Sequence, residues 1–225
     1  MNTTKKTAAG LIVLAAVIIG GFLVVGQEDT AQTTPNKITS PGLPVPGDTT
    51  SEPDPQTVLL IGDPSAKLTI IKYGDFQCPF CKEFFEDTEP AILSNYVDTG
   101  QAKIEFRVET HIGRESIRAG EAAYCANDQS RFRQYHDQLY KRQSGYNGGT
   151  FSDPNLKRIA ADLKLDQASF DACLDSKKYQ SLVEASNDEA KQNGITATPT
   201  LLIGERRVSG AQPFSIYKPL IDAQL

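Results

Sequence analysis

The sequence predicts an α/β domain with a helical region inside it, preceded by a transmembrane helix. Three observations support this prediction: an uncharged run near the N-terminus, a buried strand that leads into a helix through a Cys-x-x-Cys motif, and a mostly helical stretch from about 111 to 194. The chain has 225 residues, a formal net charge of −5 and no clustered basic face, which argues against nucleic-acid binding.

Residues 1–26 are predicted to form a cytoplasmic N-terminus and a transmembrane anchor. Two lysines precede the uncharged run 8–26, whose nineteen residues would span about 28 Å as a helix, close to one bilayer core. A cleaved signal peptide is the alternative, although the apolar region of such a peptide is usually about 7 to 15 residues long. Because the lysines lie before the run and an acidic pair lies after it, we expect the rest of the chain outside the cytoplasm.

Residues 27–57 are predicted to be a tether rather than part of a folded domain. Six prolines lie there among Thr, Ser, Gly and Asp, a composition that cannot build a core. Such a chain is extended and semi-rigid, with a contour of roughly 95 Å at the polyproline rise. The tether would hold the folded part, residues 58–225, clear of the lipid.

The motif Cys78-Pro79-Phe80-Cys81 is the candidate redox site. It follows a predicted buried strand, 68–73, and precedes a predicted helix, 83–93. At a helix N-terminus the unpaired N–H groups and the helix dipole favour a thiolate over a thiol, which can lower a cysteine pKa to roughly 3.5 to 7.5. Pro79 suits the first helical position, where its missing N–H costs nothing.

The motif has two other interpretations, a zinc site and a permanent disulfide. A zinc site needs a second pair of ligands, but the remaining cysteines, Cys125 and Cys173, stand alone and far apart, and the chain has only two histidines, His111 and His136. A permanent structural disulfide is a poor alternative, because a two-residue loop gains little chain entropy. We therefore expect redox chemistry, with no metal and no cofactor.

The stretch 111–194 shows helical periodicity in several places. Asp153-Pro154 is typical of an N-cap followed by a first-turn proline. Apolar residues recur at helical spacing in three groups: Phe132, Tyr135, Leu139 and Tyr140; Leu156, Ile159, Ala160 and Leu163; and Tyr179, Leu182, Val183 and Ala190. We interpret these as core faces.

The motif and two further stretches resemble the DsbA branch of the thioredoxin superfamily. The matching stretches are Gly62-Asp63-Pro64-Ser65-Ala66, Gly74-Asp75-Phe76-Gln77-Cys78-Pro79-Phe80-Cys81 and Gly194-Ile195-Thr196-Ala197-Thr198-Pro199-Thr200. The resemblance implies a thioredoxin fold over 58–225 with an inserted helical domain at about 111–194. It also implies a cis peptide bond between Thr198 and Pro199, facing the Cys-x-x-Cys motif.

The implied activity is thiol-disulfide exchange with unfolded or thiol-containing exported proteins. Cys78 would be the exposed nucleophile and Cys81 the resolving thiol, and a quinone-linked membrane partner would regenerate the disulfide. The candidates for an apolar rim that accepts unfolded chains are Tyr73, Phe76, Phe80 and Phe84, although each is individually more typical of a core. We expect a monomer, because the tether takes the place of the N-terminal dimerisation domain found in isomerases of this superfamily.

The net direction of exchange stays open at this point. The strongest oxidases of the resembled branch carry His at the position of Phe80, and a Thr before the cis-proline, here Thr198, is common among isomerases and reductases. A disulfide-forming oxidoreductase is our first hypothesis and a reductase or isomerase the second. A redox-inert binding module or metal chaperone is the alternative from another class, and a measurable Cys78 thiolate at neutral pH would argue against it.

Cys125 and Cys173 both fall on predicted helices of the insertion. Some DsbA-like proteins carry a second, structural disulfide there, and we expect this pair to form one in an oxidising compartment. Two buried free thiols that act as small hydrophobes are the alternative.

Lys72 departs from the resembled pattern, which usually places an acidic residue six positions before the first active-site cysteine. On a central strand its ammonium would be buried and costly unless paired. We expect a pair with Glu105, on the next predicted strand, beneath the motif, where the lysine would also attract the Cys78 thiolate. The alternative is that Lys72 reaches solvent at the strand end.

Overall fold

The computed structural model describes residues 57–225. The predicted anchor, 8–26, and the tether up to residue 56 lie outside the described residues. Within the described part, none of the helices combines the length and the apolar character needed to cross a bilayer.

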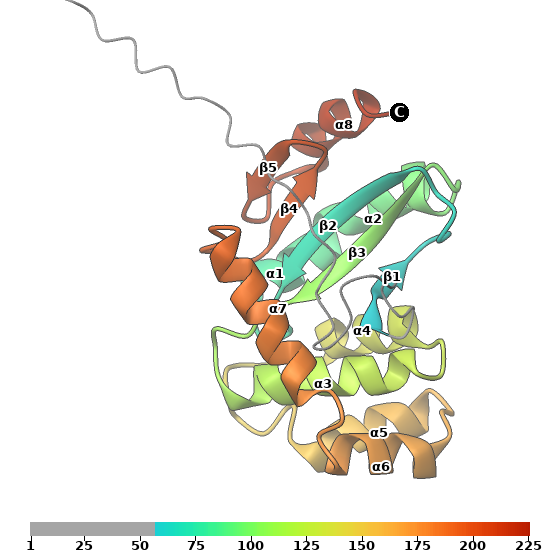
Figure 1. Cartoon of the computed structure of the whole chain (residues 1–225), viewed down its shortest axis with the longest axis vertical. Helices are drawn as coiled ribbons and strands as arrows, with labels where there is room; N and C mark the ends of the chain where they lie inside the picture. Colours follow the sequence, from blue (N-terminus) through green and yellow to red (C-terminus); the bar gives the residue numbers. More distant parts are fainter. Residues whose placement is uncertain (1–56) are drawn as a thin grey trace, which may run out of the picture. The chain divides into compact units, whose positions relative to one another are not determined.

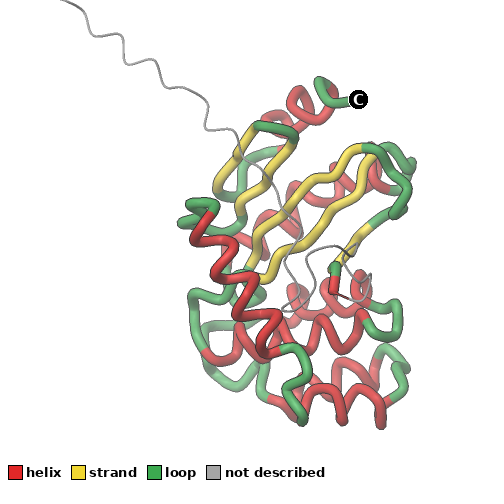
Figure 2. The backbone as a smooth tube through the Cα atoms, in the orientation of Figure 1, coloured by secondary structure: helices red, strands yellow, loops and turns green. Residues whose placement is uncertain are grey.

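A single five-stranded sheet forms the centre of the described residues (Figures 1 and 2). The strand order is β1-β3-β2-β4-β5, with β2 and β3 parallel and the other neighbours antiparallel. The strands are β1 (Leu59–Ile61), β2 (Leu68–Gly74), β3 (Ala102–Val108), β4 (Thr200–Ile203) and β5 (Arg206–Ser209). Because β2 lies in the middle, the chain that leaves its carboxyl end is close to both halves of the sheet.

One face of the sheet is covered by a continuous helical run from 79 to 97. It consists of α1 (Pro79–Glu83), a π-helical segment (Phe84–Thr88), α2 (Glu89–Ile92) and a second π-helical segment (Leu93–Val97). Pro90 has no N–H to donate, and the N–H of Glu89 bonds to the carbonyl of Phe84, five residues back. The helix α8 (Phe214–Asp222) packs beside this run, with Tyr217 edge-on to Phe84.

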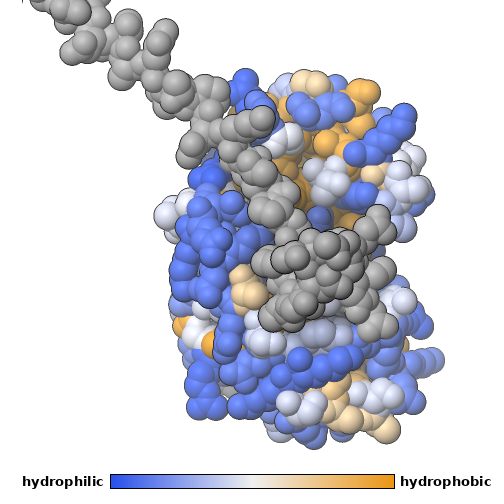
Figure 3. Space-filling view, in the orientation of Figure 1, coloured by the Kyte–Doolittle hydropathy of each residue, from blue (hydrophilic) through white to orange (hydrophobic). Residues whose placement is uncertain are grey.

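The opposite face of the sheet is covered by α7 (Gln180–Gln192). Ile71 and Tyr73 of β2 form a small apolar cluster there with Ala190 of α7 and with Ile195 and Leu202. The outward side of α7 is hydrophilic (Figure 3). The helix therefore covers apolar strand residues with one side and meets solvent with the other.

The inserted helices that the resemblance implied are confirmed. Between β3 and β4 the chain forms α3 (Arg114–Asn127), α4 (Phe132–Arg142), α5 (Asp153–Asp162), α6 (Gln167–Asp175) and α7. The three apolar groups predicted from periodicity are buried or packed on the core. Gly120 allows α3 to approach β3 closely, because a Cβ at this position would lie 2.6 Å from Cγ1 of Val108.

The structure joins Cys125 of α3 to Cys173 of α6 by a disulfide, with 5.8 Å between the two Cα atoms. Both residues belong to the apolar core of the insertion. The bond closes a loop with a sequence separation of 48, which the chain-entropy model values at roughly 4 kcal/mol.

Replacing both Cys125 and Cys173 with Ala is expected to lower the free energy of unfolding by roughly 4 kcal/mol, and the melting temperature by roughly 10 °C. Thermal melts of the variant and the parent, both with the Cys-x-x-Cys pair reduced, measure the difference. Mild reductant should open Cys78–Cys81 first and leave the buried pair intact. An unchanged melting temperature, or equal reactivity of all four cysteines towards alkylation, would contradict this prediction.

Candidate active site

Cys78 lies where β2 has ended and the helical run begins. It has extended backbone angles, φ −71° and ψ 121°, and Pro79 takes the first helical position as predicted. The carbonyl of Cys78 accepts the N–H groups of Cys81 and Lys82, both at 3.1 Å. This turn directs both cysteine side chains towards the end of the sheet, with Cys78 7% exposed and Cys81 0% exposed. Cys78 is the more accessible sulfur, although it is less exposed than the sequence led us to expect.

Thr198 and Pro199 lie opposite the cysteines. The peptide bond between them is cis, as the resemblance implied. The Sγ atom of Cys78 is 3.3 Å from the carbonyl oxygen of Thr198. The structure therefore brings together all four residues expected at the site, although Cys78 and Thr198 are 120 residues apart in the chain.

The two cysteines have opposite acidities. The pKa of Cys78 is lowered to about 6, chiefly by a hydrogen bond from the Cys81 thiol, with further donors in the Thr198 side chain and the backbone of residues 80 and 81. Partial burial opposes this effect. Burial raises the pKa of Cys81 well above its usual value, and the negative charge of Cys78 raises it further. In the reduced protein the proton therefore stays on Cys81 and the negative charge on Cys78.

The aromatic rim expected around the motif is reduced to one residue. Phe80 is 58% exposed, whereas Tyr73, Phe76 and Phe84 are buried. Phe80 occupies the second intervening position of the motif, on the first turn of α1. It is the apolar side chain of the motif that is available to a client.

The predicted pairing of Lys72 with Glu105 is wrong. In the parallel register of β2 and β3, Lys72 lies beside Phe106, and Glu105 points to the other face, where it binds Arg107 at 2.5 Å. The ammonium of Lys72 instead contacts Glu89 of α2, with Nζ 2.5 Å from Oε2. Lys72 and Glu89 are both almost completely buried.

An aromatic cage surrounds this buried ion pair. The Nζ atom of Lys72 lies 5.0 to 5.4 Å from the ring centroids of Phe84, Phe106 and Tyr140, where the negative faces of the rings favour a cation. The lysine thus satisfies its charge inside the core and does not reach solvent. Its effect on the Cys78 thiolate stays a prediction.

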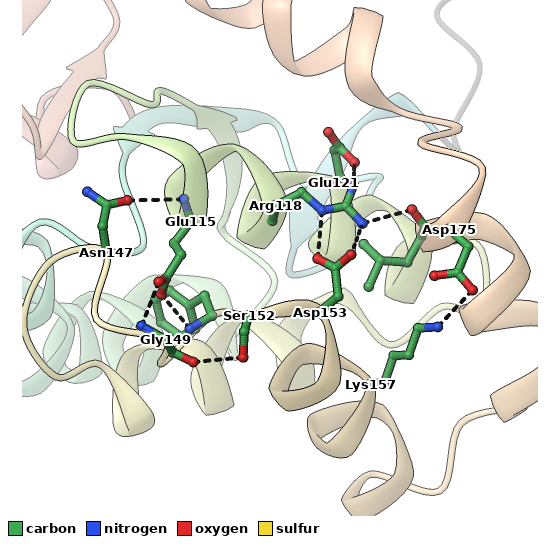
Figure 4. Close-up of polar contacts among 11 residues, drawn as sticks. Glu115, Arg118, Glu121, Asn147, Gly149, Ser152, Asp153, Lys157 and Asp175 are labelled. Atoms are coloured by element: carbon green, nitrogen blue, oxygen red, sulfur yellow. Dashed lines mark hydrogen bonds and ion pairs between the residues drawn. The ribbon is translucent and has the colours of Figure 1, made fainter.

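The loop between α4 and α5 is tied to the backbone that precedes the active helix. The side-chain amide of Gln143 donates to the carbonyls of Phe76, at 2.6 Å, and Cys78, at 3.0 Å. The N–H of Asn147 donates to the side chain of Gln77 at 2.7 Å. The carboxylate of Glu115 in turn accepts from two backbone N–H groups of the same loop, at 2.6 and 2.8 Å (Figure 4). The inserted helices therefore help to hold the motif in place.

A cavity of about 1000 Å³ lies beside α3 and α5, and Figure 4 shows the charged residues of its wall. Arg118 binds Asp153 at 2.8 and 2.9 Å and also contacts Glu121. Both carboxylates are already paired with this guanidinium, and the pair of Arg118 with Asp153 joins α3 to α5. We therefore place the chemistry at the cysteines and not in this cavity.

Two carboxylic acids close to the motif were missed by the sequence analysis. Asp75 follows β2 and Glu109 follows β3, and the N–H of Glu109 bonds to the carbonyl of Gly74 at 3.0 Å. Both carboxylates are buried. The pKa of Glu109 is raised to about 7, first by burial and then by the charge of Asp75. The signal in the sequence was the position of each acid directly after a central parallel strand, because those strand ends meet at the cysteines.

Comparisons with known proteins agree with this geometry. The family model described as thioredoxin matches residues 54–223. Disulfide bond formation protein D of Bacillus subtilis (strain 168) is 25% identical over 169 residues, which cover 74% of this chain and 76% of that protein.

Solved structures show the same fold. The crystal structure of oxidised BdbD from Bacillus subtilis aligns with a TM-score of 0.70 and 24% identity, covering 76% of this chain and 95% of that one. The structure of DsbA from Chlamydia trachomatis aligns with a TM-score of 0.66 and 23% identity, covering 82% and 97%. The expected thioredoxin-like sheet with inserted helices is thereby confirmed.

Proposed function

The chain belongs to the thioredoxin family and is a DsbA-like thiol-disulfide oxidoreductase, and from this premise we propose that it donates a disulfide between Cys78 and Cys81 to exported proteins. The observation that carries the proposal is the contrast between the two sulfurs. Cys78 has a pKa lowered to about 6, and Cys81 has a pKa raised well above its usual value. A stabilised Cys78 thiolate favours the reduced form, and an enzyme that favours its reduced form is an oxidant.

The reaction begins when a client thiolate attacks Sγ of Cys78. A client–Cys78 disulfide forms, the Cys78–Cys81 bond breaks, and Cys81 leaves as a thiolate that takes up a proton. A second client thiolate then attacks the client sulfur bound to Cys78. The client disulfide forms and Cys78 departs as the stabilised thiolate, so the client has lost two electrons and the enzyme has gained them.

Thr198 and Pro199 are proposed to line the site during this exchange. The Thr198 carbonyl lies 3.3 Å from Sγ of Cys78, and the Thr198 side chain helps to lower the Cys78 pKa. Both groups touch the atom at which the client is attached. Phe80, exposed on the same turn, is proposed to contact apolar client residues.

A reductase or isomerase is the second candidate function. It is favoured by Thr198 before the cis-proline and by Phe80 in the place where strong oxidases of the resembled branch carry His. The name of the Bacillus subtilis relative, disulfide bond formation protein D, supports the oxidase. We therefore conclude in favour of the oxidase, and the redox potential of the Cys78–Cys81 couple distinguishes it from a reductase or isomerase.

The location is proposed from the N-terminal sequence. Residues 8–26 would anchor the chain in the cell membrane by a single pass, and residues 27–57 would tether the domain 58–225 outside the cytoplasm. Clients would be unfolded or thiol-containing exported proteins. A quinone-linked membrane partner would accept the two electrons and restore the disulfide.

The redox potential and the thiolate titration test this function together. Equilibration with glutathione buffers should place the Cys78–Cys81 couple nearer to about −120 mV, the value of strong oxidants, than to about −270 mV, the value of reductants. The rate of Cys78 alkylation should be half-maximal near pH 6. Because the chain has no Trp, the redox state is followed by the mass added on alkylation. A potential near the reductant value would favour the second candidate function.

A further inference from the structure

The buried acids beside the motif pose an electrostatic problem. Asp75 is 1% exposed and Glu109 is 3% exposed, and among the described residues neither forms an ion pair with a lysine or an arginine. When client thiols reduce the disulfide, Cys78 adds a third negative charge to the same region. Three negative charges in a region of low dielectric repel one another, so uptake of a proton by one of these groups would lower the electrostatic cost of reduction.

Burial raises the pKa of Asp75, and three hydrogen-bond donors oppose this rise. Its carboxylate accepts the N–H of Gln77 at 2.8 Å and the N–H of Ile112 at 3.3 Å, and the Ser116 hydroxyl also stabilises the charged form. The backbone of Asp75 forms a hydrogen bond with the sulfur of Cys81, and this bond opposes the rise in the Cys81 pKa. A carboxylate with several donors is held in its charged form.

Glu109 has the opposite environment. Its Oε2 is buried without a hydrogen-bond partner of good geometry, and the contact to this atom comes from Nε2 of His111. His111 is 43% exposed, so the imidazole connects the buried carboxyl to solvent. Three other charges act on the Glu109 pKa: Asp75 raises it, the ammonium of Lys191 on α7 lowers it, and the Cys78 thiolate raises it.

We propose that Glu109 and His111 form a proton relay of the active site, in which Glu109 binds a proton when the Cys78–Cys81 disulfide is reduced and releases it through His111 when the disulfide re-forms. This inference rests on the proposed redox function of the two cysteines. The two client thiols supply two electrons and two protons. One proton ends on Cys81 and one on Glu109, which leaves Cys78 as the thiolate.

The relay keeps the number of buried charges constant. In the oxidised protein the negative groups are Asp75 and Glu109, and in the reduced protein they are Asp75 and Cys78. Glu109 therefore gives up its charge as Cys78 gains one. Burial and the charge of Asp75 raise the pKa of Glu109 to about 7. A small change in the electrostatic potential near neutral pH is therefore enough to protonate or deprotonate this carboxyl.

The decisive measurement is the number of protons bound on reduction. It is obtained from the change of the redox potential between pH 6.5 and 7.5, since each bound proton changes the reduction equilibrium tenfold per pH unit. The parent protein should bind one proton on Cys81 and an additional fraction of a proton on Glu109, so its count should clearly exceed one. Glu109→Gln should bind only one. Glu105→Gln is the matched control, because Glu105 lies on β3, close to Glu109 in the chain, and its carboxylate is paired with Arg107; this variant should bind the same number of protons as the parent.

The role of His111 is tested by the rate of disulfide transfer. His111→Asn should slow disulfide transfer to a reduced peptide at pH 7 several-fold without changing the number of bound protons, and added imidazole should restore the rate. A purely structural role of His111 would not respond to imidazole and would overturn its part in the relay.

A measurement on the unmodified protein covers the case in which Glu109→Gln does not fold. The infrared difference between the reduced and the oxidised protein at pH 7 should show a protonated carboxyl band that appears on reduction. Absence of this band, or an equal proton count in Glu109→Gln and the parent, would overturn the relay. Failure of the proposed function is a separate result, because the parent would then not exchange disulfides with the peptide at all.

Discussion

Cys78→Ser is expected to lower disulfide transfer to the uncatalysed rate, because no other sulfur in the described residues is placed to accept the client. Cys81 is 0% exposed and its pKa is raised by burial, and Cys125 and Cys173 are already bonded to each other. The assay follows the disulfides gained by a reduced, unfolded test protein. The double variant of Cys125 and Cys173 serves as control and should keep its activity at a temperature below its own melting transition.

Cys81→Ser is expected to have the opposite consequence for client binding. Attack through Cys78 still forms the mixed disulfide, but no resolving thiol remains to break it. Clients should therefore accumulate on Cys78 and be seen on non-reducing gels and by mass spectrometry. Recovery of clients on Cys81 in a Cys78→Ser variant would reverse the roles that we assign to the two cysteines.

The second large effect is expected from the buried ion pair. Glu89→Ala leaves the ammonium of Lys72 buried in the aromatic cage without a counter-charge, and loss of one partner of a buried pair costs roughly 3 to 5 kcal/mol. The free energy of unfolding in urea should fall by that amount. Glu86→Ala is the control, because Glu86 lies on the same helical run in an exposed pair with Lys82 at 3.8 Å, and its loss should cost less than about 1 kcal/mol.

A double replacement distinguishes the loss of the whole ion pair from the burial of one unpaired charge. Lys72→Met combined with Glu89→Leu removes both ions and fills the space with apolar atoms, so it should recover most of the stability that Glu89→Ala loses. Equal destabilisation by the single and the double variant would contradict the ion pair as the source of the effect. The same double variant tests the tuning of Cys78. An unchanged Cys78 pKa would remove Lys72 and Glu89 from the chemistry.

The sequence predicted the parts of the site that depend on local pattern or on a motif. The Cys-x-x-Cys turn, Pro79 at the first helical position and the helices of the insertion all follow from residues close together in the chain. Thr198 and Pro199 were found only by resemblance, because nothing local indicates which residues face the cysteines from across the sheet.

The partner of Lys72 was missed because alternation along a strand does not reveal what covers the strand. The expected counter-charge was on β3, where the register places Phe106 beside Lys72. Glu89 comes from the helix that packs over this face. A signal was present, since Glu89 lies between the buried residues Phe84 and Ile92 on the apolar side of the helical run. A charged residue at a core position of a helix indicates an opposite charge on the element beneath it.

The amide of Gln143 has a consequence for protein engineering. It holds the carbonyls of Phe76 and Cys78 from a loop that belongs to the insertion and not to the sheet. The backbone position of Cys78 is thus adjustable from a residue that neither reacts nor contributes to the central core. Libraries that vary the α4–α5 loop while leaving the cysteines untouched would explore a series of oxidants of graded strength on one scaffold.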